Sequence, residues 1–239
     1  MTWGLCQPEK RLPEGWFPIR GDMVRHAEFA GLTVFEKLCL LDIIHRVHRH
    51  LYLAKGGFRE GPFIEGDAQW AKRLQMSVEA FRLARRKIGR AINARSEKGL
   101  GWFTYTPGYR TQGGVTRRTE YHDCEFAKPA RGIQSGAMAR YTWFHALENL
   151  RKKQLEHADV VVCAMLAYFW KIGGGRENGS AVIPKQCITP TTGMSNSAFL
   201  ESVGRLHDVM SDLYSFQEGH KYVDVSDWRG GPDRVWQAA

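Results

Sequence analysis

Apolar residues recur at every third or fourth position over several long segments, which is the spacing of a helix with one buried face. In the first half this pattern predicts a helix over Thr33 to His50 and another from Ser77 to about Arg95, capped by Thr33 and Ser77. A shorter helix, Ala68 to Leu74, is predicted between them, with Asp67 as its cap. A hairpin is then predicted, with strands over Trp102 to Thr106 and Thr116 to Cys124 joined by a loop that contains glycines.

The second half has the same order of predicted elements. A long apolar helix is expected over Ala158 to Lys171 and a short helix over Pro184 to Thr191. Ser195 then caps a third helix, Asn196 to Leu213. A short hairpin follows around Gln217 to Gly219, with Tyr222 to Val225 as its return strand.

The two halves also share residues at a fixed spacing. Residues 74–81 and 192–199 have Met, Ser, Ala and Phe in the same places, at an offset of 118. Further matches are Ile88 with Leu206, Ile92 with Met210, and the upstream aromatic pairs Trp16-Phe17 and Trp143-Phe144. We interpret these matches as an internal repeat. Residues 127–140, rich in Gly, Ala and Ser, are then the expected linker.

A helix, a short helix, a tight turn, a third helix and a hairpin follow one another in winged helix-turn-helix modules. The expected fold class is therefore mainly α with small β-hairpins (α+β), with two such modules in tandem. Module 1 covers residues 1–130 and module 2 covers residues 131–239.

Composition excludes several classes of protein. The 239 residues are 43% hydrophobic and 25% charged, as in folded globular proteins. The longest apolar run, Val160 to Trp170, is too short to span a bilayer. Five widely spaced cysteines without a CxxC pair argue against a disulfide framework or a thiolate metal site, so we expect a cytoplasmic protein.

Charge points to a polyanionic partner. The formal net charge is +9, and residues up to Ala130 account for +8 of it. On a helical wheel with 100° per residue, the face of the Ser77 helix opposite Phe81 has arginines spaced by four. Arg can bind guanine O6 and N7 in a major groove, so this is the expected recognition helix for double-stranded DNA. Its expected DNA-contacting residues are Ser77, Glu79, Arg82, Arg86, Arg90 and Asn93.

The hairpin after this helix carries Arg110, Arg117 and Arg118 beside a pair of glycines, which is typical of a wing along the DNA backbone. The alternative is a solvated basic face on an ordinary surface helix. We favour DNA binding because the basic helix and the basic hairpin occur together.

The corresponding helix of the second half lacks the arginines. Its outward positions are Ser197, Leu200, Glu201, Gly204 and Asp208. We expect Leu200 and Gly204 at an interface with a second subunit or another protein. The alternative is a shifted pose on DNA that uses Lys185, Arg205, His207 and Lys221.

No chemistry beyond binding is expected. His45, His48 and His50 cluster without a supporting acidic or thiol ligand, so we predict no metal site. There is no nucleotide-binding loop, and no carboxylate or Cys-His pair stands at a catalytic spacing. The sequence therefore predicts a protein that is not an enzyme and has no cofactor.

Two winged-helix modules, the first with an arginine-bearing helix from Ser77 to Asn93, resemble plasmid and phage replication initiators of the tandem winged-helix type. The resemblance covers Trp16 to Trp228 and rests on architecture and on the Met-Ser-x-x-Ala-Phe turns. It implies repeated sites at an origin, repression of the initiator's own promoter, a monomer–dimer equilibrium through one module, and recruitment of a host helicase. The near-neutral second module departs from an initiator in which both modules bind DNA.

Two other functions stay open at this point. A transcriptional repressor of a mobile element would use the same DNA-binding face, and a winged-helix adaptor would bind protein instead. Repeated direct sites favour the initiator, whereas a single inverted repeat favours a dimeric repressor. Steep salt dependence of DNA binding separates both from the adaptor.

Overall fold

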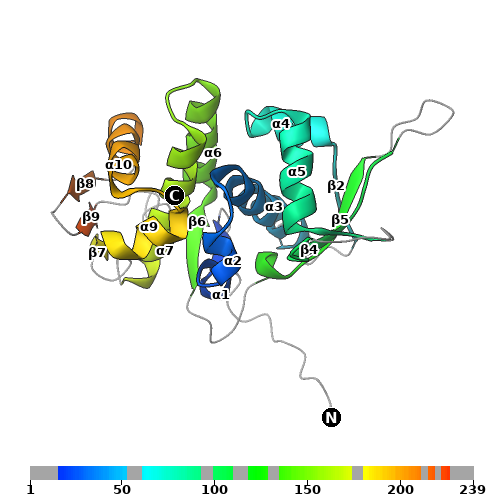
Figure 1. Cartoon of the computed structure of the whole chain (residues 1–239), viewed down its shortest axis with the longest axis horizontal. Coiled ribbons are helices and arrows are strands. Elements are labelled where there is room, and N and C mark those ends of the chain that lie inside the picture. Colours follow the sequence, from blue (N-terminus) through cyan, green and yellow to red (C-terminus); the bar gives the residue numbers. More distant parts are fainter. Residues whose placement is uncertain are drawn as a thin grey trace, which may run out of the picture.

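Two series of elements form the two ends of the molecule (Figure 1). The structure is a computed structural model, and it describes residues 16–52, 61–92, 99–109, 118–128, 135–173, 180–210, 215–218 and 222–226. Within these residues the fold is α+β, mostly helical with small sheets, as the sequence predicts.

The first series begins with a long helix and ends in a small sheet. Its elements are α3 (Val34–Tyr52), β2 (Phe63–Glu65), α4 (Asp67–Arg73), α5 (Val78–Ile88), β3 (Arg90–Ala91), β4 (Phe103–Thr106) and β5 (Thr119–Cys124). The strands form a sheet in the order β2-β5-β4-β3, in which β3 runs parallel to β4 and the other pairs are antiparallel.

The second series repeats this order. Its elements are α7 (His157–Ile172), β7 (Ser180–Pro184), α9 (Lys185–Thr192), α10 (Asn196–Met210), β8 (Ser215–Glu218) and β9 (Tyr222–Ser226). Its sheet has the order β7-β9-β8, so the strand between the first two helices again pairs with the last strand of the hairpin.

Each series also contains the same ion pair. Glu36, in the first turn of α3, accepts a hydrogen bond from the Thr33 N–H (2.8 Å) and pairs with Lys87 of α5 (2.8 Å). Asp159, in the first turn of α7, accepts from the Glu156 N–H (2.7 Å) and pairs with Arg205 of α10 (2.9 Å). Because Lys87 and Arg205 stand at the offset found in the sequence, these pairs support the internal repeat.

A two-stranded ribbon joins the two series. Its strands are β1 (Trp16–Arg20) and β6 (Ser135–Ala139), which pair antiparallel. The remaining elements are α1 (Gly21–Val24), α2 (Ala27–Ala30), η1 (Glu125–Ala127) and α6 (Arg140–Arg151). The sequence predicts none of these elements, and the expected linker over 127–140 is wrong in part because β6 lies within it.

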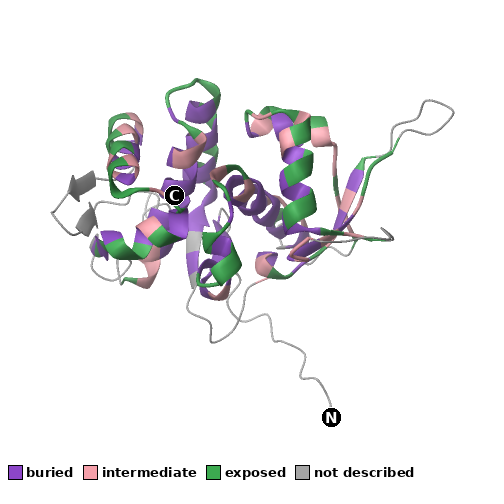
Figure 2. Ribbon diagram, in the orientation of Figure 1, coloured by how far each residue is buried: buried purple, intermediate pink, exposed green. Residues whose placement is uncertain are grey.

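Most buried apolar side chains of the described residues form one large cluster that extends through both series (Figure 2), while Trp16 and Ala139 form a small separate one. Phe17 of β1 contacts Trp143 of α6 edge to face, with ring centroids 5.6 Å apart. The aromatic pairs matched in the sequence therefore touch one another, but one lies on a strand and the other on a helix. Their equivalence in the repeat is wrong.

Two helix boundaries also differ from expectation. The helix α5 ends at Ile88 and not near Arg95, because Gly89 leaves the helix in an extended conformation and its α-carbon lies against the ring of Phe103. Ile92, expected in the core, is consequently 39% exposed. At the start of α4 the cap is Gly66, and Asp67 is the first helical residue.

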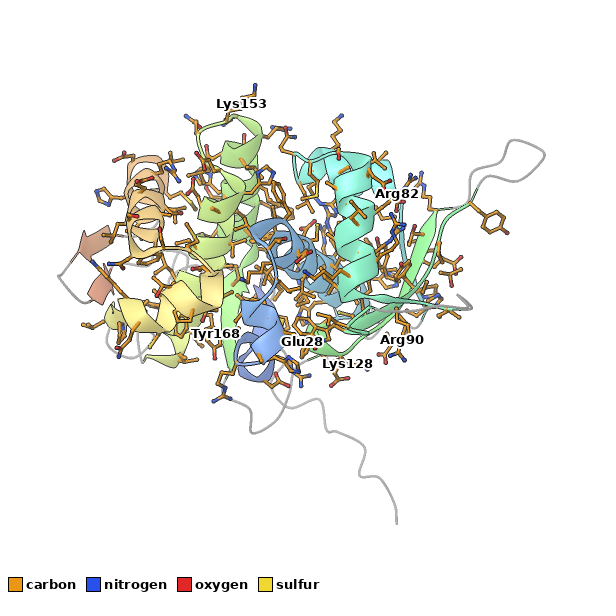
Figure 3. All side chains as sticks on the ribbon, in the orientation of Figure 1. Glu28, Arg82, Arg90, Lys128, Lys153 and Tyr168 are labelled. Atoms are coloured by element: carbon orange, nitrogen blue, oxygen red, sulfur yellow. The ribbon has the colours of Figure 1, made fainter. Side chains whose placement is uncertain are left out.

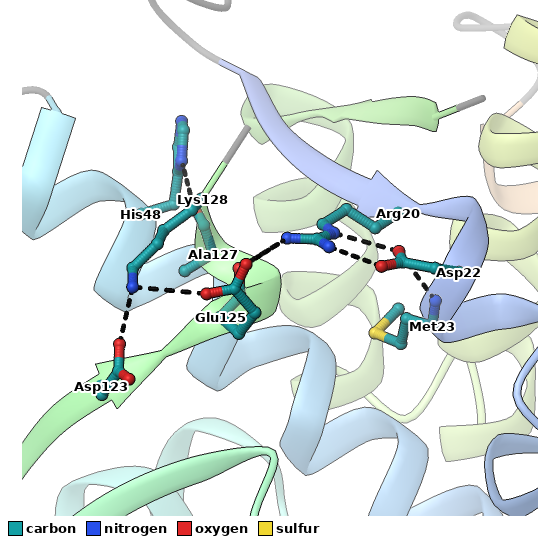
Figure 4. Close-up of polar contacts among 8 residues, drawn as sticks. All are labelled: Arg20, Asp22, Met23, His48, Asp123, Glu125, Ala127 and Lys128. Atoms are coloured by element: carbon teal, nitrogen blue, oxygen red, sulfur yellow. Dashed lines mark hydrogen bonds and ion pairs between the residues drawn. The ribbon is translucent and has the colours of Figure 1, made fainter. Parts of the chain in front are cut away.

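A polar cluster fastens β1 to the end of β5 (Figure 4). Arg20 donates to Asp22 (3.0 Å) and to the carboxylate of Glu125 (3.0 Å). His48 of α3 donates from Nδ1 to the carbonyl of Ala127 (2.8 Å), and burial lowers the pKa of this ring to about 4. His48 is therefore a neutral core residue near neutral pH.

A buried carboxylate connects the first series to α6. Asp42 of α3 accepts hydrogen bonds from Arg73 (2.7 Å) and from the indole N–H of Trp143 (3.0 Å). Burial alone would raise its pKa, but the charge of Arg73 and the nearby His45 hold the pKa below its usual range. Because a buried ion that loses its partner is strongly destabilising, this group fixes α4 and α6 on α3.

A buried lysine makes a second connection. Lys37 of α3 is fully buried and donates to the carbonyls of Ala30 (3.2 Å) and Thr192 (3.1 Å), at the ends of α2 and α9. Burial lowers its pKa from 10.5 to about 8. The positive charge near helix carbonyl ends is favourable, but its desolvation is costly.

We expect this lysine to make stability depend on pH. The unfolded chain keeps the proton up to the ordinary pKa of 10.5, whereas the folded protein loses it near 8. The free energy of unfolding should therefore rise between pH 8 and 10.5, by roughly 3 kcal/mol relative to the Lys37→Met variant. Urea unfolding of both proteins across this range measures the difference, and a difference that is flat with pH contradicts the assignment.

Candidate nucleic-acid interface

The helix α5 is fixed by one buried face. Ser77 caps it, and its Oγ accepts a hydrogen bond from the Ala80 N–H (3.0 Å), as expected from the sequence. Phe81 stacks on Trp70 of α4, with centroids 5.5 Å apart and planes 10° apart. The opposite face is open to solvent and holds Glu79, Arg82, Leu83, Arg86 and Lys87.

Each cation on this open face has an acidic partner within the chain. Arg82 pairs with Asp67 (2.8 Å) and Arg86 with Glu79 (2.8 Å), while Lys87 pairs with Glu36 as described above. The guanidinium side chains of Arg82 and Arg86 remain about half exposed, at 49% and 58%. Exposed pairs of this kind contribute only about 0–1 kcal/mol, so these arginines can exchange partners at little cost.

Arg90 lies outside this face. It was expected one turn beyond Arg86, but it belongs to β3, opposite Thr104 of β4. Figure 3 shows Arg82 on the upper part of α5 and Arg90 near the strands at its lower end. The predicted stripe of three arginines therefore reduces to two on the helix, with a third exposed cation at the edge of the sheet.

A buried arginine that the sequence analysis did not assign holds α5 against the sheet. Arg85 is 5% exposed, forms an ion pair with Asp67 and donates to the hydroxyl of Thr119 (3.0 Å). Its guanidinium lies over the rings of Phe81 and Tyr105, 5.7 Å and 4.7 Å from their centroids. On the helical wheel Arg85 falls about 40° from Phe81, and this position on the core side was the available signal.

The turn before α5 is held by the second series. Gln75 has a left-handed backbone with φ of 51°. The Nε2 atom of His157, at the start of α7, lies 2.9 Å from the Leu74 carbonyl and 3.1 Å from the Gln75 carbonyl. The position of α5 therefore depends on contacts from both halves of the chain.

The predicted wing is described only at its base. Arg118 is exposed and precedes β5, while Thr119 accepts a hydrogen bond from the Gly108 N–H (3.2 Å). Arg110, Arg117 and Asn93 lie outside the described residues. The basic tip of the hairpin therefore stays a prediction.

The helix α10 presents a different surface. Ser197, Glu201, Gly204 and Asp208 are exposed as expected, but Leu200 is half-buried against the core and is not the exposed leucine predicted from the wheel.

The cations proposed for a shifted DNA pose of α10 are also largely occupied. Lys185 is buried, and Arg205 donates two hydrogen bonds of 2.9 Å to Asp159. His207 is exposed, and Lys221 lies outside the described residues. This pose therefore has less cationic surface than the sequence suggested.

The histidines of α3 do not gather at a surface. His45 and His48 are buried on different partners, and burial lowers both pKa values. Among the described residues, no group of three or more His, Cys, Asp or Glu side chains could hold a metal ion. No described helix has both the length and the apolar character needed to cross a bilayer.

Comparison with known proteins does not identify a relative. No family model, no curated protein and no solved structure matches the chain. The functional interpretation therefore rests on the fold and the surface of α5.

We expect Arg85 and Arg82 to differ in their effect on stability, although both pair with Asp67. Arg85→Met removes a buried cation that links α5 to β5 and should lower the free energy of unfolding by roughly 3–5 kcal/mol. Arg82→Met removes an exposed pair and should cost less than about 1 kcal/mol. Chemical denaturation of the two variants measures this contrast, and equal losses would refute the structural role of Arg85.

Proposed function

We propose that this protein binds double-stranded DNA in a sequence-specific manner, with α5 in the major groove. The observation that carries the proposal is the half-exposed pair Arg82 and Arg86 on the open face of a capped helix that precedes a hairpin. The order helix, strand, helix, helix, hairpin, with the first strand beside the hairpin, is that of a winged helix-turn-helix module. Both series have this order, which supports two modules in tandem.

In this mode of binding the arginines leave weak partners for stronger ones. Arg86 exchanges the carboxylate of Glu79 for guanine O6 and N7, to which an arginine fork binds bidentately. Arg82 pairs with Asp67, which also accepts a hydrogen bond from Thr119, the residue after Arg118. Arg82 and Arg118 bind phosphates, which set the register without reading sequence. Arg85 remains with Asp67 and keeps the helix aligned with the hairpin.

We propose a replication initiator of a plasmid or phage type as the biological role. Tandem modules of unequal charge suit it, since module 1 supplies affinity for DNA and module 2 is left for contacts with a second subunit or with host proteins. A transcriptional repressor of a mobile element uses the same face, and direct or inverted repeats in the bound DNA separate the two roles. An adaptor role would show no steep dependence of DNA binding on salt.

We expect Arg86→Ala to lower discrimination between DNA sites. Sites should first be selected from random duplexes with the full chain, because β1 of module 1 pairs with β6 of module 2 and a fragment would lose this pairing. On the selected site the variant should lose about 1–3 kcal/mol of preference over an unrelated duplex. Arg118→Ala should instead weaken both duplexes about equally and reduce the salt slope by about one.

The matched control is Arg151→Ala. Arg151 is an exposed arginine at the end of α6, with 66% of its side chain accessible and an acidic partner, Glu148, at 3.9 Å. Loss of one positive charge there should leave the preference between duplexes unchanged. Binding measured by fluorescence anisotropy that falls equally in the Arg86 and Arg151 variants would show that α5 does not read bases.

Gly204→Arg tests the role of α10. A Cβ atom at this exposed position meets no other atom within 4 Å, so the substitution should not disturb folding. If α10 contacts a second subunit, the variant should have a lower mass by light scattering than the wild-type protein and similar DNA binding. Unchanged mass with tighter DNA binding would instead place α10 on DNA, because the added cation neutralises a phosphate.

A further inference from the structure

A large apolar side chain stands in the middle of the charged face of α5. Leu83 is 57% exposed. The other exposed side chains on this helix are all charged: Glu79, Arg82, Arg86 and Lys87. On a wheel of 100° per residue Leu83 lies within about 20° of the direction opposite Phe81, the centre of the buried face. Leu83 and Glu79, each about 20° from that direction, point most directly away from the core, and Leu83 is the apolar one of the two.

The neighbours of Leu83 do not cover it. Glu79 lies one turn before it and Arg86 one turn after it, and these two residues pair with each other at 2.8 Å. Lys87 is drawn toward Glu36 of α3, and Arg82 toward Asp67 of α4. Charged side chains thus flank Leu83 on both sides, and the leucine still remains 57% exposed.

The proposed binding mode brings this leucine to the floor of the major groove. A helix face that enters the groove meets the edges of the bases with its central residues and the phosphates with its flanks. Among the base edges in that groove, the 5-methyl group of thymine is the apolar one, and apolar side chains contact it. The positive charges on both sides of Leu83 can pair with the negatively charged phosphates of the two DNA strands.

We propose that Leu83 is a specificity-determining residue that contacts the 5-methyl group of a thymine beside the guanine bound by Arg86. This inference rests on the proposed DNA-binding function. Because Leu83 and Arg86 are three residues apart on one face, their Cβ atoms are about 5–6 Å apart. That separation corresponds to one or two base steps, so the thymine and the guanine lie within two base steps of each other.

Replacement of thymine by deoxyuridine tests the contact, because it removes one methyl group and leaves the hydrogen-bonding edge unchanged. Each thymine of the selected duplex is replaced in turn, and affinity is measured for the full-length protein. We expect one position at which the wild-type protein loses about fourfold in affinity, the value for one buried methyl group. Deoxyuridine at that position should change the affinity of the Leu83→Ala variant very little. This variant should bind the thymine duplex about as weakly as the wild-type protein binds the deoxyuridine duplex.

Val182→Ala is the matched control. Val182 is also an exposed aliphatic side chain (60%), but it lies on β7 of the second series. This variant should keep the full sensitivity to deoxyuridine. Circular dichroism of both variants should match that of the wild-type protein, because neither side chain is in the core.

The outcomes separate this inference from the proposed function. If the protein selects a site but no deoxyuridine changes its affinity, the contact with thymine is wrong while DNA binding stands. If Leu83→Ala and the wild-type protein respond equally to deoxyuridine, another residue contacts the methyl group and the inference also fails. Absence of binding to any duplex at low salt overturns the proposed function itself, whereas a change in oligomeric mass with Leu83→Ala identifies a protein-binding face.

Discussion

Asp42 carries a full negative charge where water cannot reach it, and the arrangement of α4 and α6 on α3 depends on how that charge is satisfied. An ion in the core is tolerated when hydrogen bonds and an opposite charge replace its hydration. Arg73 supplies the charge from α4, and the indole of Trp143 supplies a hydrogen bond from α6. Arg73 in turn binds both carboxylate oxygens of Glu65 on β2, at 2.9 Å each. One buried group thus places α4, with its partner strand β2, and α6 on the same helix, α3.

A second carboxylate, Asp67, is likewise satisfied by opposite charge beneath the proposed DNA-binding face. Asp67 joins two arginines of α5, one buried and one exposed, and the difference in exposure separates their roles. If Arg85 left Asp67, its buried guanidinium would lose the opposite charge that compensates for its lost hydration, so Arg85 holds the helix in place. Arg82 and Arg86 have solvent as an alternative partner, so they are available to a ligand. A rigid helix with exchangeable cations is well suited to recognition of a polyanion.

The two series share the order of their elements but differ on the open face of the third helix. Both retain an acid in the first turn of the first helix and its partner cation on the third helix, Glu36 with Lys87 and Asp159 with Arg205. The positions that match Arg82 and Arg86 of α5 are Leu200 and Gly204 in α10. Contacts that position the third helix are therefore similar in the two series, whereas the residues on its open face differ.

Local periodicity was sufficient to predict the helices α3, α5, α7 and α10 and the cap at Ser77, because each depends on neighbouring residues alone. The end of α5 was not predictable in this way: apolar spacing continues through Ala91 and Ile92, but the close approach of Phe103 to Gly89 ends the helix. The strands β1, β2 and β6 are short and gain their hydrogen bonds from partners far along the chain, so no local pattern marks them. Among the arginines of α5, the helical wheel separates Arg85 on the core side from Arg82 and Arg86 on the open face. Sequence alone could not show what holds Arg85, since its partners Asp67 and Thr119 come from two other elements.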